Sequence, residues 1–310
     1  MKFEHALEVG TRKLFSFNPV VADKAALTAK GAGRVIDLFL KTWMGIVGIL
    51  IILFFVGVVV YADLFVPYER TDVTTNKLAD SSWEHPFGTD ELGRDILTRT
   101  MHGTKASLFI GFTAMALSMG LGTVVGLASG YWGGWRDEVI MRVNDVFLSI
   151  PWLVLMIVIA SIWGAQDLNS VIVVIGLTGW STTARIVRSQ VLSIKARQFI
   201  ERAKAIGAGD AHIIRKHILP NVVPLIFANA ILTIAISILS ESSLSFLGLG
   251  PQDVETWGRI LEDAYAASAA LGGPYMFIVM PGLCIVIVVL GFTFIGYAMD
   301  EVLNPKLRKR

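Results

Sequence analysis

The chain has 310 residues, of which 54% are hydrophobic and 17% are charged. Soluble domains usually carry about a quarter charged residues, so this composition excludes an ordinary soluble domain and indicates a membrane protein. The formal net charge of +2 gives no indication of nucleic-acid binding, and a single cysteine, Cys284, excludes a disulfide or a cysteine metal site within the chain.

Charge-free stretches predict six membrane-spanning helices, because about 20 apolar residues cross a bilayer as a helix. In chain order they are 43–62, 106–135, 146–166, 168–184, 218–240 and 264–299, the last with an apolar core from residue 275. The fourth stretch is the shortest, and five spans are the alternative if it does not cross. The first is longer than the ~7–15-residue core of a signal peptide, so we expect it to remain as an anchor. The predicted fold class is an all-α polytopic membrane protein.

Lysine and arginine predict the orientation, because cytoplasmic loops of membrane proteins carry an excess of both. With a cytoplasmic N-terminus, 21 of the 27 Lys and Arg residues fall in the four segments 1–42, 136–145, 185–217 and 300–310. Both termini are then cytoplasmic, and the segments 67–105 and 248–274 lie outside. The predicted organisation is a cytoplasmic lead 1–42, a first transmembrane helix 43–66, an extracytoplasmic segment 67–105, a five-helix transmembrane domain 106–300 and a basic tail 301–310.

Charges and glycines near the second and third spans predict local contacts. The extracytoplasmic segment holds a group of charged residues that we interpret as an ion-pair cluster, with contact to a docking partner as the alternative: Asp90, Glu91, Arg94 and Asp95. At the inner boundary, Arg142 and Asp145 lie close enough on one helix to pair.

Small residues at four-residue spacing let helices approach closely. The second span carries such a series: Gly122, Gly126, Gly130 and Gly134.

Three residues in the predicted spans are candidates for a pathway or gate. Pro151 and Pro224 break helix hydrogen bonds at membrane depth, which is tolerated where protein or a cavity covers the break. Glu241 is an acid near the apolar run of the fifth span, and an ionisable group there is a functional hypothesis by default. Its place at the outer end of the span predicts that the carboxylate reaches water.

The cytoplasmic stretch 196–220 predicts two short helices joined by a bend. Four residues of its first half share one helix face: Phe199, Ile200, Ala203 and Ile206. Gly207 suits the end of that helix, where a left-handed backbone carries no Cβ clash. Asp210 is placed to cap the helix that follows. Pro220 suits the first turn of the next span, where its missing N–H is not needed.

The same stretch resembles the EAA loop of ABC importer permeases. Glu201, Ala203, Gly207, Leu219 and Pro220 stand at positions 1, 3, 7, 19 and 20 of its twenty-residue pattern. The chain departs from the pattern at Arg202, where an Ala is expected, and at His217, where Ile is expected. The resemblance implies that the loop docks into a cleft of an ATPase subunit. The residues so implicated are Glu201, Arg202, Ala203, Gly207, Asp210, His217, Leu219 and Pro220.

Four further stretches resemble dipeptide and oligopeptide ABC permeases of the C type: 85–111, 137–155, 179–199 and 241–261. The resemblance covers about residues 35–305 and implies the type I importer fold with both termini cytoplasmic, in a bacterial inner membrane. It also implies a second homologous permease, two P-loop ATPase subunits that bind ATP and Mg, and an extracytoplasmic substrate-binding protein. One departure is that only Pro251 precedes Trp257 and Gly258, where the family often carries paired prolines.

The sequence carries no motif for an enzyme active site or a cofactor. It contains neither the P-loop pattern G-x-x-x-x-G-K-[ST] nor the zinc pattern H-E-x-x-H, so we expect a non-catalytic subunit without a cofactor of its own. The substrate predicted from the resemblance is a di- or oligopeptide, with nickel complexes, glutathione and oligosaccharides as alternatives. A secondary transporter driven by an ion gradient and a non-transporting membrane scaffold are the hypotheses from other classes.

Overall fold

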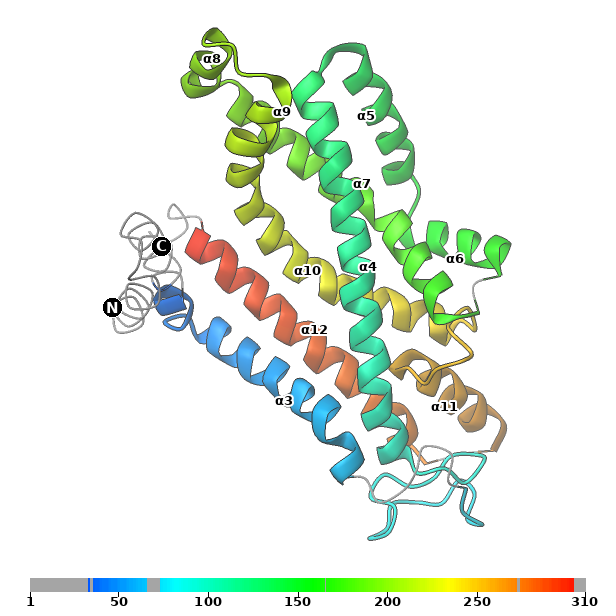
Figure 1. Cartoon of the computed structure of the whole chain (residues 1–310). Coiled ribbons are helices and arrows are strands. Elements are labelled where there is room, and N and C mark those ends of the chain that lie inside the picture. The colour runs from blue at the N-terminus through cyan, green and yellow to red at the C-terminus, as the bar shows by residue number, and fades with distance from the viewer. Residues whose placement is uncertain (1–32, 34–35, 66–72, 165, 272–273, 304–310) are drawn as a thin grey trace.

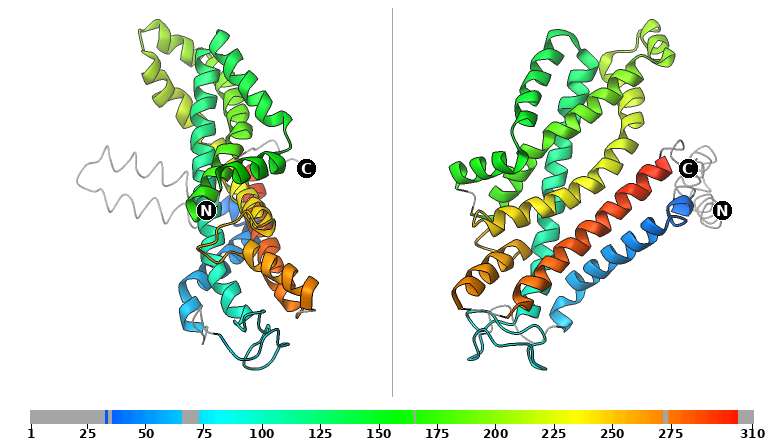
Figure 2. Two further views of the ribbon diagram at one scale, coloured as in Figure 1. Left: turned by 90° about the vertical axis from the view of Figure 1, so that its right-hand side faces the viewer. Right: turned by 180° about the vertical axis from the view of Figure 1, so that it is seen from behind.

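The computed structural model describes residues 33, 36–65, 73–164, 166–271 and 274–303. Across these residues the regular structure is helical, apart from one isolated bridge between Thr89 and Asp95. The helices form an elongated bundle, with the segment before α4 (Ile96–Trp132) at one end and the short helices α8 (Gln198–Ala205) and α9 (Asp210–Ile213) at the other (Figures 1 and 2). Most of the predicted lead 1–42 and of the tail 301–310 lies outside the described residues.

Five helical runs among the described residues are long and apolar enough to cross a membrane. They are α3 (Trp43–Phe65), α4, α7 (Leu168–Lys195), the run from Asp210 to Phe246 and α12 (Met276–Leu303). The fourth run joins α9, a π-helical turn η1 (Ile214–Ile218) and α10 (Leu219–Phe246). A sixth span results if α5 (Gly134–Ser149) and α6 (Trp152–Trp163), which meet at 93°, count as one broken span. Outside these runs, the described residues also form α8, α11 (Trp257–Leu271) and a helical turn at residues 36–39.

The structure corrects which predicted span is interrupted. The stretch 168–184, expected to be the weakest, belongs to α7, an unbroken helix of 28 residues. The stretch 146–166 is the interrupted one, because Ile150 is extended and Pro151 separates α5 from α6. A proline removes one backbone donor and disfavours helical geometry in the residue before it, which accounts for the break.

Two predicted boundaries were also wrong. The second span was expected from residue 106, but α4 begins at Ile96 and includes two charged residues, Arg99 and Lys105. The stretch 264–299 is not one element, since α11 ends at Leu271 and α12 begins at Met276. A count of charge-free residues does not locate either boundary. The helix α4 continues through Arg99, whose charge is paired, and the apolar run 264–299 continues through the turn between α11 and α12.

The most extensive helix contact joins α7 to the C-terminal half of α4, which it crosses in Figure 1. A Cβ atom added to Gly126 would lie 2.6 Å from the carbonyl oxygen of Ala184, so the two backbones touch without an intervening side chain. Gly122 and Gly130 face α7 in the same way. The predicted packing role is therefore confirmed for these three glycines. It was wrong for Gly134, which has a φ of +60° and nothing within 4 Å of an added Cβ.

The opposite end of α4 is fixed by a buried arginine. Arg99, only 1% exposed, donates to Asp90 at 2.8 Å, to Glu255 at 2.8 Å and to Asp263 at 2.5 Å. Arg94 completes the cluster with a 2.6 Å bond to Asp90. These contacts tie the extracytoplasmic segment, α4 and α11 together. An ion-pair cluster was predicted here, but its centre, Arg99, was missed.

Two charged residues have other partners than the sequence indicated. Asp95 is the N-cap of α4, where it accepts from the backbone N–H of Thr98 at 2.7 Å and lies 3.0 Å from Nδ1 of His85. Asp145 pairs with Arg185 of α7 at 2.5 Å. The expected pair of Asp145 with Arg142 on the same helix was therefore wrong, because a neighbouring helix brings a closer cation.

We expect Gly126→Ala to destabilise the protein by about 1–3 kcal/mol, because the added methyl group overpacks a backbone contact. Gly120→Ala is the matched control, since it lies on the same helix with open space at the Cβ position. Thermal unfolding of the purified variants in one detergent measures the difference. Equal stability of the two variants would contradict the packing assigned to Gly126.

Arg99→Gln is predicted to cost about 3–5 kcal/mol, because it removes the buried cation of the cluster and leaves three carboxylates to Arg94 alone. Arg136→Gln serves as the control, because Arg136 is exposed and its described contact is with the ring of Trp135. The measurement is the midpoint of thermal unfolding together with protease access to residues 73–95. An unchanged midpoint for Arg99→Gln would show that the cluster does not hold this end of the molecule.

Candidate functional site

The bend after α8 is a Schellman motif built on Gly207. The glycine has a φ of +85°, as its predicted place at the helix end requires. The N–H of Gly207 donates to the carbonyl of Lys204 at 2.9 Å, and the N–H of Ala208 donates to the carbonyl of Ala203 at 3.0 Å. Both bonds satisfy carbonyls that the end of the helix leaves free. The hairpin of residues 198–218 therefore has a defined bend.

The second half of the hairpin differs from the prediction at Asp210 and agrees with it at Pro220. Asp210 does not cap α9, whose N-cap is Gly209; its carboxylate accepts instead from the hydroxyl of Tyr131 at 2.6 Å. Pro220 lies in the first turn of α10, as predicted, and the helical run from Asp210 continues through it. The turn before it is π-helical, with the N–H of Leu219 donating to the carbonyl of Ile214. This wider turn gives the proline ring room inside the helix.

The hairpin buries one part of its apolar face and exposes another. Ile200 and Ala203 pack in a buried cluster with Ile213 and Ile218. Ile206, which the sequence placed on the same face, is 86% exposed at the bend. An isoleucine so exposed at the end of an ordered hairpin contributes little to the packing of this chain.

The other residues implicated in docking lie on α8 and at the base of the hairpin, where it joins α10. Glu201 and Arg202 of α8 are exposed, as is Pro220. The ring of His217 is partly buried and lies 6.1 Å from that of Phe199. Leu219 is partly buried at the start of α10. The hairpin therefore offers a mixed apolar and charged surface.

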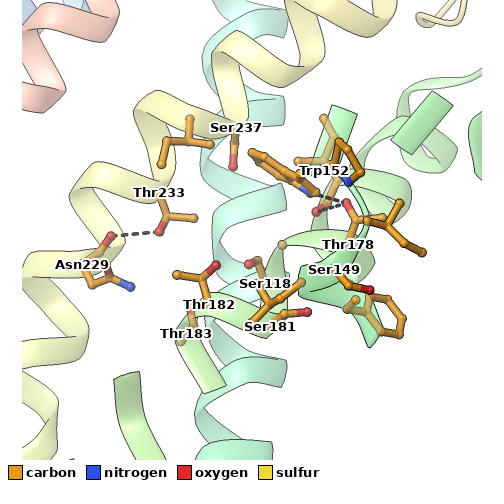
Figure 3. A pocket seen from close by; sticks show the side chains of 17 residues that line it. Ser118, Ser149, Trp152, Thr178, Ser181, Thr182, Thr183, Asn229, Thr233 and Ser237 are labelled. Carbon is orange, nitrogen blue, oxygen red and sulfur yellow. Dashed lines mark hydrogen bonds between the residues drawn. The ribbon is translucent and has the colours of Figure 1, made fainter. Parts of the chain in front are cut away.

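A cavity of about 490 Å³ lies between the middle of the bundle and the break at Pro151. Side chains of α4, α7 and α10 line it together with the end of α5 and the start of α6 (Figure 3). Neutral polar residues supply much of the lining: Ser118, Ser149, Thr178, Ser181, Thr182, Thr183, Asn229, Thr233 and Ser237. None of the described residues that line the cavity is Asp, Glu, Lys, Arg or His. The lining can form hydrogen bonds with a solute but offers no ionic anchor.

Hydrogen bonds fix part of this lining. Nε1 of Trp152 donates to Oγ1 of Thr178 at 2.9 Å, so the first residue of α6 is held against α7 (Figure 3). The hydroxyl of Thr233 donates to the carbonyl of Asn229 at 2.9 Å. Thr182 is exposed, and no described residue bonds its hydroxyl. It is available to a solute.

The three pathway candidates have different outcomes. Pro151 lines the cavity, at the break that was predicted for it. Pro224 lies inside α10 and is not among the lining residues. Glu241 also lies away from the cavity, and the expectation that its carboxylate reaches water was wrong. Glu241 is fully buried, because the turn after α10 and the start of α11 cover this end of the helix. Its carboxylate accepts from the hydroxyl of Ser245 at 2.7 Å.

Sequence reasoning missed the polar face that lines the cavity, although a signal was present. Asn229, Thr233 and Ser237 recur every four residues along an otherwise apolar span. On α7 the run from Ser181 to Thr183 places three hydroxyls in succession. A search for charges and prolines passed over these neutral residues, which are the commoner polar side chains inside helix bundles in membranes.

Comparison with known proteins agrees with this architecture. The family described as binding-protein-dependent transport system inner membrane component matches residues 122–309. The dipeptide transport system permease protein DppC of Alkalihalophilus pseudofirmus is 38% identical over 270 residues, which cover 86% of this chain and 88% of that protein. The oligopeptide transport system permease protein OppC of Bacillus subtilis is 36% identical over 275 residues, with 87% and 88% covered.

A solved structure supports the fold. The MetNI methionine ABC transporter, in inward-facing conformations, contains a chain that matches with a TM-score of 0.54 and 21% identity, covering 67% of this chain and 96% of that one. This likeness concerns the fold alone. The match to the family over residues 122–309 and the extended similarity to its members lead to one conclusion: the chain belongs to the family of inner-membrane components of binding-protein-dependent transport systems.

Proposed function

We propose that this chain imports di- or oligopeptides as one of two permease subunits of an ATP-driven importer, the other being a related but distinct chain. Two ATPase subunits bind ATP and Mg on the cytoplasmic side, so this chain is non-catalytic and holds no cofactor. An extracytoplasmic binding protein delivers the solute. The names of the relatives, which refer to dipeptide and oligopeptide transport, support this choice of solute.

The observation that carries the proposal is the exposed Ile206 on an ordered hairpin. The Schellman bend at Gly207 holds the isoleucine away from the buried cluster of the hairpin, with its side chain 86% exposed. Apolar anchors that enter a partner's pocket dominate the energy of many protein interfaces. Docking of Ile206 in a cleft of an ATPase subunit, with Glu201 and Arg202 at the rim, explains why the chain keeps it exposed.

The cavity supports a solute with many amide groups. Hydroxyl and amide side chains can exchange hydrogen bonds with a peptide main chain whatever its side chains are. Secondary transporters coordinate their coupling ions near the membrane midplane, often with ionisable side chains. The described lining lacks ionisable side chains, which favours coupling to ATP hydrolysis over coupling to an ion gradient.

Ile206→Asp is predicted to reduce ATP-dependent peptide uptake at least tenfold, because loss of an interface anchor costs about 2 kcal/mol or more. The assay uses proteoliposomes with both permeases, the ATPase subunits and the binding protein, and copurification of the ATPase subunits is measured in parallel. Ile206→Leu, which keeps an apolar side chain, is the control. Normal uptake by Ile206→Asp would refute the docking role, and wild-type uptake driven by an ion gradient without ATP would establish a secondary transporter instead.

A bulky side chain at Thr182 should narrow the cavity and lower uptake several-fold without preventing insertion. Thr182→Phe is suited to this test, because the side chain lines the cavity and no described residue bonds its hydroxyl. Ser161→Phe on α6 is the control, since Ser161 is exposed and does not line the cavity. Equal uptake by both variants, at equal amounts of complex in the membrane, would mean that solute does not pass through this cavity.

A further inference from the structure

Tyr131, at the cytoplasmic end of α4, contacts three separate elements. Its buried side chain donates to Oδ1 of Asp210, the first residue of α9, at 2.6 Å. Its carbonyl accepts from Nζ of Lys195, at the end of α7, at 2.5 Å. Its ring lies 5.6 Å from Nζ of Lys195 and 5.7 Å from Nζ of Lys204 in α8, within the range of cation–π attraction. One residue of α4 therefore touches the end of α7 and both halves of the hairpin.

The helices that line the cavity form two bodies. α4 and α7 are one body, because the glycines Gly122, Gly126 and Gly130 bring their backbones into contact. The run from α9 through α10 is the other body, and it carries Asn229, Thr233 and Ser237 on the facing side of the cavity (Figure 3). The two bodies touch beyond the cavity, where a Cβ atom added to Gly111 of α4 would meet Ile238 of α10, so the angle between them sets the width of the cavity.

At the cytoplasmic end, the two bodies meet through apolar packing and one directed bond. Val191 and Ile194 of α7 pack in one cluster with Ile213 and Ile218 of the hairpin. Such packing is not directional, so it resists separation but does not fix an angle. In the described part of the chain, the bond from Tyr131 to Asp210 is the side-chain hydrogen bond that joins α4 to the hairpin.

We propose that Tyr131 is a positioning residue that passes movement of the hairpin to the α4–α7 pair and so links ATPase docking to the width of the cavity. This inference rests on the proposed function, because it takes the hairpin as the docking element. Ser118, where α4 lines the cavity, is thirteen residues before Tyr131, or about 20 Å along the helix. A continuous helix connects the two positions, so a tilt imposed at Tyr131 reaches the cavity.

The test compares Tyr131→Phe with wild type in the full complex in liposomes. Phenylalanine keeps the ring and removes the hydroxyl that donates to Asp210. The readout is uptake of a mixture of labelled peptides of two to five residues, divided by the ATP hydrolysed in the same vesicles. We expect this ratio to fall roughly threefold to tenfold, the range that the net contribution of one hydrogen bond allows. Misfolding would lower uptake and hydrolysis in parallel and leave the ratio unchanged.

Two further sets of variants separate the bond from general effects. Tyr297→Phe is the matched control, because Tyr297 is exposed and no described residue bonds its hydroxyl. Asp210→Ala removes the acceptor of the same hydrogen bond, and Asp210 is exposed, so the change disturbs little packing. It tests the same link if the complex with Tyr131→Phe assembles poorly. Asp210→Asn keeps an acceptor oxygen and should restore most of the ratio. Combining Tyr131→Phe with Asp210→Ala should lower the ratio no further than the worse single change.

The outcomes distinguish this inference from the function on which it rests. An unchanged ratio in Tyr131→Phe at wild-type amounts of assembled complex, or additive losses in the double variant, would overturn the role of Tyr131 while leaving an ATP-driven importer intact. Wild-type uptake that needs neither ATP nor the ATPase subunits would overturn the proposed function itself. A lower ratio in both single variants, with Tyr297→Phe unchanged, is the expected result.

Discussion

The backbone contact between α4 and α7 is the constraint on which the rest of the molecule depends. In a bilayer, apolar side chains gain little by leaving lipid for a neighbouring helix, so association depends on close packing. The glycines at 122, 126 and 130 permit that packing along the cytoplasmic half of α4. The α4–α7 pair forms one side of the cavity, and the end of α5, the start of α6 and the polar face of α10 form the other sides. The cavity is the space beside the α4–α7 pair that α5, α6 and α10 leave unfilled.

The break at Pro151 is consistent with this arrangement. Unpaired backbone groups are costly in hydrocarbon, so irregular backbone at membrane depth survives where protein or a water-filled cavity covers it. Residues 147–152 line the cavity on one side, and Trp152 is held to Thr178 on the other. The interrupted helix and the polar side chains of α7 and α10 line the same cavity. The cavity gives the unpaired backbone groups at the break and the polar side chains a place away from lipid.

The sequence predicted the order of the apolar helices, because hydrophobic length is a local property, and its count of six holds if α5 and α6 form one broken span. It also predicted the bend at Gly207, where the φ of +85° requires glycine. It could not predict features that depend on distant partners. Arg99 lies inside α4 because Asp90, Glu255 and Asp263 converge on it from three parts of the chain. Asp210, a plausible cap by position, meets Tyr131 through the tertiary fold, and Glu241 is buried by the segment that follows its own helix.

The two ends of α4 are held in ways that differ in strength, and the difference suggests where the molecule can move. At the extracytoplasmic end, a buried arginine with three carboxylate partners fixes α4 to α11 and to the segment before it. Pulling α4 away from α11 there would leave several buried charges without their partners at once, which is costly. At the cytoplasmic end, α4 meets the hairpin through apolar packing, the contact of Lys204 with the ring of Tyr131 and one hydroxyl–carboxylate bond at a partly exposed site. Rearrangement is therefore cheaper at the cytoplasmic end, where a partner that hydrolyses ATP would act.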